Sequence, residues 1–228
     1  MLLKKWEDLP AALRSEQVYP YYASLQQKKD SLLAKLIFDR VVSLVMLIGL
    51  SPIFLLLAIM IKLDSPGEIF FRQERVTQYG RRFRIHKFRT MIKNAEALGT
   101  QVTTKSDLRV TNIGKKLRGC RLDELPQLID ILQGNMSFVG TRPEVTKYVE
   151  QYTPEMLATL LLPAGVTSEA SIEYKDEERL LADTQNADKT YVEVVLPQKM
   201  AWNLRSLRDF SFMGDIKTMI KTVWAVVR

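Results

Sequence analysis

The sequence predicts a predominantly helical α/β protein with a small sheet, attached to a membrane through a broken apolar helix. The first indication is an uncharged run of 21 residues, Val41–Ile61. The second is Phe83–Arg89, where apolar and basic residues alternate with the period of a strand. The third is the helical spacing of apolar residues over 125–132. At 228 residues and 46% hydrophobic content, the chain can bury the core of one domain with appendages.

Residues 1–34 form an extension ahead of the apolar run. The segment mixes polar residues with aromatic ones, among them Trp6, Tyr19, Tyr21 and Tyr22. Because Tyr and Trp near a membrane often sit at the level of the headgroups, we expect the extension to lie at the interface or against the main domain.

The run Val41–Ile61 is long enough to cross a bilayer, since a straight helix of this length measures roughly 32 Å. Ser51-Pro52 stands at its centre, and proline removes a backbone donor and clashes with the preceding turn, so the helix must kink or break there. Two arrangements remain: a kinked spanning helix, or a re-entrant helix-break-helix that enters and leaves by one face. The Ser51 hydroxyl is available to a backbone group freed at the break. A buried core helix of a soluble protein is the alternative, disfavoured by the uniform apolarity.

The formal net charge of +7 and the pI of about 9.4 indicate an anionic partner: nucleic acid, anionic lipid or a phosphorylated substrate. From Arg72 to Lys93 there are eight basic residues and one acid. A strand here places Arg84 and His86 on one side, facing a phosphate-rich site; a solvated basic face is the alternative. The single cysteine, Cys120, excludes an intrachain disulfide, and we expect it to serve packing. We expect His86, the only histidine, to be an ordinary strand residue rather than a catalytic base.

Asp123 and Glu124 precede a helix that carries Pro126 in its first turn. The helix dipole favours acids at this end, so position alone favours an N-cap and a first-turn acid over a catalytic pair.

The remaining elements follow from local patterns. We expect a helix and loop over 107–121, a helix end at Gly134, helices over 144–162, a turn-rich loop over 165–171, a charged helix over 176–187, and an amphipathic basic helix from Asp215 onward, packed on the core or at a membrane interface.

Five blocks stand in a recognisable order. They are Lys35–Arg40 (KLIFDR) before the Ser-Pro run, Phe71–Val76 (FRQERV), Phe83–Met91 (FRIHKFRTM), Leu122–Leu128 (LDELPQL) and Asn135–Pro143 (NMSFVGTRP). Together they resemble the bacterial sugar transferase family, the monotopic phosphoglycosyl transferases, strongly over residues 35–145 and weakly elsewhere.

The resemblance implies a re-entrant membrane helix at 35–63 and a cytosolic domain at 64–228 with an amphipathic C-terminal helix, behind the extension 1–34. Members of the family move a phosphosugar from a UDP-sugar to a polyprenol phosphate, usually undecaprenyl phosphate. They use Mg²⁺, release UMP and act at the cytoplasmic face of the bacterial inner membrane, where they begin surface-polysaccharide or glycan synthesis. The partners implied are the donor, the acceptor and membrane lipids, with no nucleic acid. The amphipathic segments leave room for a homodimer.

The resemblance also implies roles for individual residues. Asp123 would be the nucleophile that attacks the β-phosphorus of the donor. Glu124 would hold Mg²⁺ together with Asp123, or accept the proton of the lipid phosphate. Lys87, Arg118 and Arg142 would contact phosphates, Arg142 in bidentate fashion.

The sequence departs from the family pattern in three places. Thr141 and Asn135 replace the usual proline and aspartate, and the block 162–168 lacks an arginine and a glycine, so contacts made by that loop are expected to differ. Two other functions stay open. One is a membrane-anchored basic adaptor that binds nucleic acid or anionic lipid, although the sequence has no recognisable nucleic-acid motif. The other is a pathway scaffold with a decayed site, supported by the altered loop 163–168. The intact pair Asp123-Glu124 favours an active enzyme.

Overall fold

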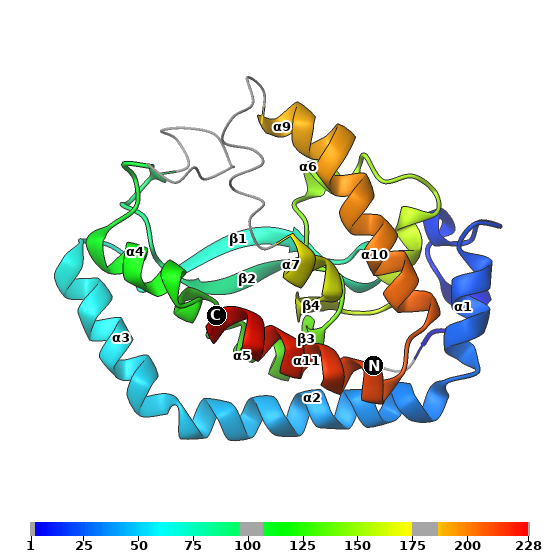
Figure 1. Ribbon diagram of the computed structural model, residues 1–228, viewed down its shortest axis with the longest axis horizontal. Helices are drawn as coiled ribbons and strands as arrows, with labels where there is room; N and C mark the ends of the chain where they lie inside the picture. The colour runs from blue at the N-terminus through cyan, green and yellow to red at the C-terminus, as the bar shows by residue number, and fades with distance from the viewer. Residues whose placement is uncertain (1–2, 96–106, 175–186, 228) are drawn as a thin grey trace.

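The computed structural model describes residues 3–95, 107–174 and 187–227 (Figure 1). The charged helix expected at 176–187 lies outside these residues except for Ala187, where α9 begins.

The described chain is mostly helical with two small sheets, as the sequence predicts. The helices are α1 (Tyr19–Gln26), α2 (Lys29–Gly49), α3 (Ser51–Asp64), α4 (Asn112–Gly119), α5 (Gln127–Gln133), α6 (Thr146–Val149), α7 (Glu169–Glu173), α9 (Ala187–Thr190), α10 (Leu196–Arg208) and α11 (Phe212–Val227). The strands are β1 (Phe70–Val76), β2 (Arg82–Phe88), β3 (Met136–Val139) and β4 (Ala164–Thr167). β1 pairs with β2 antiparallel, Arg72 opposite His86, and β3 pairs with β4 parallel.

The apolar run breaks where the sequence predicts. α2 ends at Gly49 and α3 begins at Ser51, and the two axes are bent by 62°. Pro52 lies in the first turn of α3, and the Ser51 hydroxyl donates to the carbonyl of Ile48 at 2.7 Å. Within the described chain, no single helix is long and apolar enough to cross a membrane, but α2 and α3 together reach that length and composition as a bent pair.

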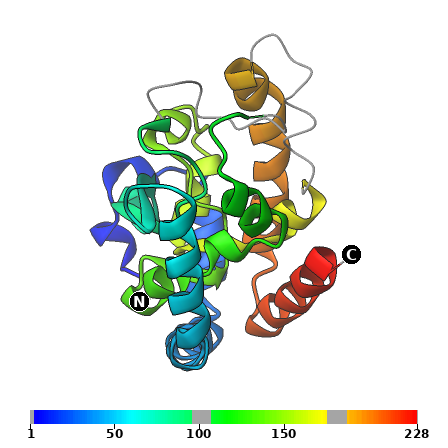
Figure 2. The ribbon, with the colours of Figure 1, turned by 90° about the vertical axis from the view of Figure 1, so that its left-hand side faces the viewer.

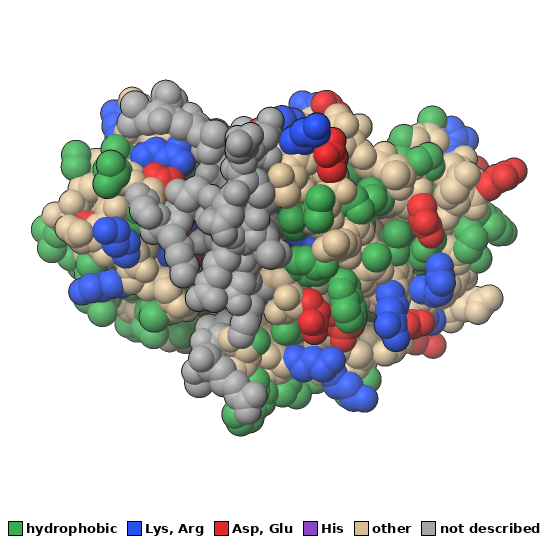
Figure 3. Space-filling view, turned by 45° about the horizontal axis from the view of Figure 1, so that its top comes forward, with side chains coloured by type: hydrophobic (Ala, Val, Ile, Leu, Met, Phe, Trp, Pro, Cys, Tyr) green, Lys and Arg blue, Asp and Glu red, His purple; other side chains and the backbone are tan. Residues whose placement is uncertain are grey.

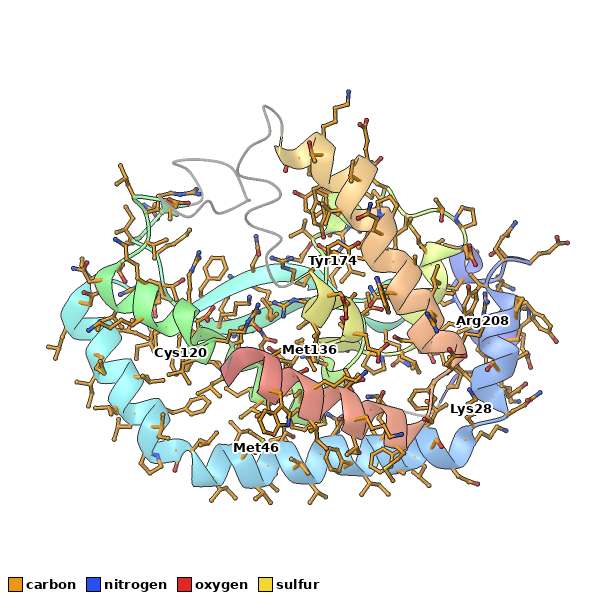
Figure 4. All side chains as sticks on the ribbon, in the orientation of Figure 1. Lys28, Met46, Cys120, Met136, Tyr174 and Arg208 are labelled. Atoms are coloured by element: carbon orange, nitrogen blue, oxygen red, sulfur yellow. The ribbon has the colours of Figure 1, made fainter. Side chains whose placement is uncertain are left out.

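The bent pair α2–α3 forms an elbow around the rest of the chain (Figure 1). Its inner side packs on β2, α5 and β3, where Phe38 and Met46 join a cluster that includes Ile85, Ile131 and Phe138. Along its lower side the side chains point away from the rest of the molecule (Figure 4). The large apolar residues exposed on the elbow are Leu33, Ile37, Val41, Leu44, Val45, Ile48, Ile53, Leu55, Leu56, Ile59 and Leu63. The elbow is therefore a half-covered element, not a core helix buried on all sides.

Both ends of the elbow are fastened to the same domain. Near the first end, the Lys35 ammonium donates to the carbonyl of Val139 at 2.8 Å and to the Asp215 carboxylate of α11 at 2.6 Å. At the other end, Asp64 accepts from the backbone N–H of Ile113 in α4 at 3.0 Å. Both legs of the elbow therefore contact the same domain.

The N-terminal extension packs against the main domain. Leu13, Val18 and Leu25 are buried in a cluster that includes Leu161 and Leu207, which belong to a 3₁₀ segment (Met156–Leu161) and to α10. Of the two placements expected for the extension, the structure has the one against the domain.

Two expected elements differ. The loop expected at 165–171 includes β4, which pairs with β3 because Gly140 and Gly165 let the two backbones meet: a Cβ on Gly165 would lie 2.1 Å from the Gly140 nitrogen. In place of a largely helical 144–162 there are only the one-turn α6 and the 3₁₀ segment Met156–Leu161.

The expected C-terminal amphipathic helix is present as α11. It contacts α2, β3 and β4, and Figures 1 and 2 show it alongside α2. Its Met213, Ile220, Val223 and Trp224 are exposed. By contrast, charged side chains of both signs are scattered over the face that carries α9 and α10 (Figure 3).

Candidate active site

Asp123 and Glu124 lie in a 3₁₀ turn, Leu122–Glu124, between α4 and α5. Arg121 before the turn has a left-handed backbone (φ 53°), which redirects the chain at the end of α4. α5 begins at Gln127 with Pro126 at its N-cap position, so the two acids precede the helix by a turn and do not cap it. The N-cap interpretation is therefore wrong, and the positions of the acids need another explanation.

Glu124 is the centre of a cluster of opposite charges. Its Oε1 accepts from the Lys87 ammonium at 3.0 Å and from Arg142 Nη2 at 2.6 Å, and its Oε2 accepts from Arg142 Nη1 at 3.2 Å. The Glu124 side chain is only 12% exposed. Burial by itself raises the pKa of this carboxyl, but the charges of Arg142 and Lys87 and their hydrogen bonds outweigh it, so the pKa lies well below its ordinary value. Glu124 is ionised at neutral pH.

Asp123 has the opposite shift. Burial raises the pKa of its carboxyl, and the neighbouring Glu124 charge adds to the effect, while Lys87 and Arg118 lower it. Arg118 is oriented from α4 by its Nε, which donates to the Thr90 hydroxyl at 2.9 Å. The structure thus brings together all five residues that the sequence singled out: Asp123, Glu124, Lys87, Arg118 and Arg142.

The altered loop 163–168 reaches this cluster through its backbone. Arg142 Nη1 donates to the carbonyl of Val166 in β4 at 3.0 Å, in addition to Glu124. A main-chain acceptor does not depend on the side chains that the block 162–168 lacks. The departure from the family pattern leaves this support for Arg142 in place.

On β2 the sequence selected the wrong side of the strand. Lys87 faces Glu124, whereas Arg84 is exposed. His86 is held by Asp130 of α5: its Nδ1 lies 2.8 Å from Oδ1, and its backbone N–H donates to Oδ2 at 2.8 Å. His86 is thus a strand residue with a structural partner, as expected. Asp130 is fully buried, and nothing in the local sequence marks its role, because its partner is 44 positions away.

Cys120 is exposed at the C-terminal end of α4, so the expectation that it serves packing is wrong.

The two carboxylates suit a magnesium ion that takes most of its ligands from a substrate. Among the residues that the structure describes, no group of three or more His, Cys, Asp or Glu side chains gathers as in a closed metal site. Mg²⁺ is usually held by one or two carboxylates together with substrate phosphates and water. Glu124 is already bonded to two cationic side chains, which leaves Asp123 as the better placed ligand.

Comparison with known proteins agrees with the motif order. The sequence model of the bacterial sugar transferase family matches residues 30–228. The chain is 34% identical over 180 residues to UDP-N-acetylgalactosamine-undecaprenyl-phosphate N-acetylgalactosaminephosphotransferase of Aeromonas hydrophila, covering 78% of this chain and 40% of the relative.

A second relative is UDP-glucose:undecaprenyl-phosphate glucose-1-phosphate transferase of Caulobacter vibrioides, 32% identical over 84% of this chain and 68% of the relative. A third is the exopolysaccharide production protein ExoY of Sinorhizobium fredii, 30% identical over 85% of each chain. The chain therefore spans less than half the length of the first relative and most of the length of the other two.

Proposed function

The chain belongs to the bacterial sugar transferase family, and from this membership we propose that it transfers a phosphosugar from a UDP-sugar to undecaprenyl phosphate and releases UMP. The observation that carries the proposal is the half-buried Asp123 beside Glu124, surrounded by Lys87, Arg118 and Arg142. A diphosphate donor and a phosphate acceptor bring several negative charges, which such a cluster of cations stabilises.

In the first half-reaction, a carboxylate oxygen of Asp123 attacks the β-phosphorus of the UDP-sugar. A bond forms between this oxygen and phosphorus, the bond from phosphorus to the bridging oxygen breaks, and UMP leaves with the electron pair. The charges of Lys87 and Arg118 lower the pKa of Asp123 in the free protein, so both cations lie near its carboxylate, where they can bind donor phosphates. The raised pKa of Asp123 fits a nucleophile that is poorly solvated and therefore reactive.

In the second half-reaction, an oxygen of the lipid phosphate attacks the same phosphorus and displaces Asp123. Arg142 bridges Glu124 and the backbone of β4, and its forked guanidinium suits the phosphate that arrives or leaves. Because the pKa of Glu124 is low, it is a poor proton acceptor in the free protein; we assign it instead to holding Lys87 and Arg142 and, with Asp123, to binding Mg²⁺. The ion would neutralise charge on the donor diphosphate.

The elbow supports a proposal for the position of the site relative to the membrane. We propose that residues 35–63 enter and leave the cytoplasmic leaflet by one face, that 64–228 form the cytosolic domain, and that α11 lies at the interface. Support comes from the 62° bend, the exposed apolar outer side of α2–α3, and the attachment of both legs to one domain. A site beside such an elbow can meet a soluble donor and a membrane-bound acceptor together. Protease-accessible tags before residue 3 and after residue 227 test this, because tags on opposite sides of the membrane would exclude the re-entrant arrangement.

The test of the proposed function is a UMP-release assay with purified protein, Mg²⁺, undecaprenyl phosphate in detergent, and UDP-glucose or UDP-N-acetylgalactosamine. UMP release that requires Mg²⁺ and is lost in EDTA supports the proposal. The competing adaptor function has the basic β1–β2 ribbon in its favour. Salt-sensitive DNA binding without UMP release from any UDP-sugar would favour the adaptor.

A further inference from the structure

The segment 141–144, which carries Arg142, has no regular secondary structure, so its geometry depends on what surrounds it. Its backbone is held at three points. Gly165 donates to the carbonyl of Thr141 at 2.8 Å, Arg75 Nη1 donates to that of Pro143 at 3.1 Å, and Val76 donates to that of Glu144 at 2.9 Å. The last two contacts come from β1.

The Glu144 side chain supplies a further attachment, to a different part of the chain. Glu144 is buried, and its Oε1 accepts from the hydroxyl of Tyr191. Lys199 lies 3.8 Å from the same oxygen and donates to the Tyr191 hydroxyl at 3.2 Å. Tyr191 and Lys199 are also buried, and the Lys199 ammonium stands 5.1 Å from the centre of the Tyr191 ring. A buried carboxylate without such partners would be costly, so the three side chains hold one another in place.

Tyr191 opens a π-helical turn, Tyr191–Val195, that runs into α10. π-turns are rare and occur often at functional sites, where they place a side chain that a regular helix would direct elsewhere. Here the turn places the Tyr191 hydroxyl within hydrogen-bonding distance of Glu144. Glu144 is two residues from Arg142, which is bonded to Glu124.

We propose that Tyr191, acting through Glu144, is a positioning residue that holds Arg142 in register with Glu124. The proposal rests on the proposed function, because it assigns Tyr191 a role in that reaction. Pro143 stands between Arg142 and Glu144, and its ring restricts its φ angle. A displacement of the Glu144 backbone therefore also displaces Arg142, because rotation about φ of Pro143 cannot compensate for it. Glu124 is bonded to Lys87 and Arg142, and the contacts of Tyr191 and Lys199 reach Glu144.

The chain contains a matched control pair. The hydroxyl of Tyr148 donates to Asp188 at 2.7 Å, and the Tyr148 and Tyr191 rings touch at 4.7 Å between centroids. Tyr148→Phe therefore removes a tyrosine–carboxylate bond from the same aromatic cluster but not the one that ends on Glu144. Tyr191→Phe removes a hydrogen-bond partner of Glu144, whereas Tyr148→Phe removes a hydrogen-bond partner of Asp188.

The experiment compares Tyr191→Phe with Tyr148→Phe in the UMP-release assay, together with the Tm of each variant. We expect both to be folded at the assay temperature, and only Tyr191→Phe to lower kcat/KM for the UDP-sugar, by about ten-fold. Adding Glu144→Gln to Tyr191→Phe should lower kcat/KM by less than Glu144→Gln does alone, since both variants remove the Tyr191–Glu144 contact and only the ion pair with Lys199 is lost in addition. Equal kcat/KM for Tyr191→Phe and Tyr148→Phe would overturn the proposal, as would a full additional loss in the double variant.

If Tyr191→Phe does not fold, Glu144→Gln against Asp188→Asn makes the same comparison from the acid side, and equal activity of these two would again overturn it. A wild-type protein that releases no UMP would count against the proposed function itself, a result distinct from an active protein that is indifferent to Tyr191.

Discussion

Replacing Glu124 by Gln should destabilise the fold and make its stability less dependent on pH. Gln keeps the size and an acceptor oxygen but removes the negative charge that faces Lys87 and Arg142. Removing one partner from a buried ion cluster costs about 3–5 kcal/mol. Since Lys87 and Arg142 are 23% and 27% exposed, water screens part of the loss, and we expect about 1–3 kcal/mol.

The pH dependence has a defined sign. The folded-state pKa of Glu124 is depressed, so the stabilisation from its charge is present above the ordinary value of 4.5 and is lost as pH falls through the lower folded-state value. For a chain of this size, 1 kcal/mol corresponds to about 2–4 °C in Tm. The Tm of Glu124→Gln should therefore be about 2–12 °C below that of the wild type at neutral pH. The difference should shrink as the pH falls below 4.5.

Thermal unfolding followed by circular dichroism in detergent measures both effects. Glu74→Gln is the matched control, because Glu74 also pairs with an arginine, Arg82, at 3.4 Å, but is 53% exposed. Its Tm should change by less than about 1 °C. An unchanged Tm for Glu124→Gln at neutral pH, or a difference that persists unaltered into acid, would show that the Glu124 charge does not stabilise this cluster.

Three further outcomes follow from particular contacts. Asp123→Asn should raise the Tm at neutral pH. Burial raises the folded-state pKa of Asp123 above its ordinary value of 3.8, so the ionised carboxylate destabilises the fold at a pH above 3.8. The difference in Tm between variant and wild type should vanish when both are unfolded below pH 3.8. Gly165→Ala should cost about 3 kcal/mol in chemical denaturation, because its Cβ would meet the Gly140 backbone, whereas Gly119→Ala has open space and should not. Ile48→Glu, on the exposed outer side of α2, should move protein out of the membrane fraction, since a charge at bilayer depth costs about 3 kcal/mol; Leu108→Glu, 97% exposed but off the elbow, should leave it there.

Features of the fold fixed by local chemistry could be predicted from the sequence. Pro52 cannot continue an unkinked helix, so the break in the apolar run follows from one residue. The strand β2 follows from alternation, but alternation does not say which side of the strand faces the site. It favoured the side of Arg84, whereas Lys87, which the family resemblance selected, is the residue that faces Glu124. The strand β4 was missed because it is four residues long and exists only by pairing with β3 where two glycines meet.

The long-range contacts that hold the site in place could not be predicted from the sequence. Asp130 holds His86 from 44 positions away, and Tyr191 reaches Glu144 from 47. Such pairs leave no periodicity or motif, because each partner looks like an ordinary residue of its own local segment. Four of the five site residues, by contrast, lie in motif blocks whose order predicted their association: Lys87, Asp123, Glu124 and Arg142. Arg118 stands outside these blocks.

The covalent mechanism is tested most directly by mass spectrometry of the wild-type protein mixed with a UDP-sugar and Mg²⁺ in the absence of undecaprenyl phosphate. A covalent intermediate on Asp123 predicts about one UMP released per protein and a phosphosugar adduct on the peptide that contains Asp123, with neither in Asp123→Asn. Release of UMP only when the acceptor is present, with no adduct on Asp123, would contradict it.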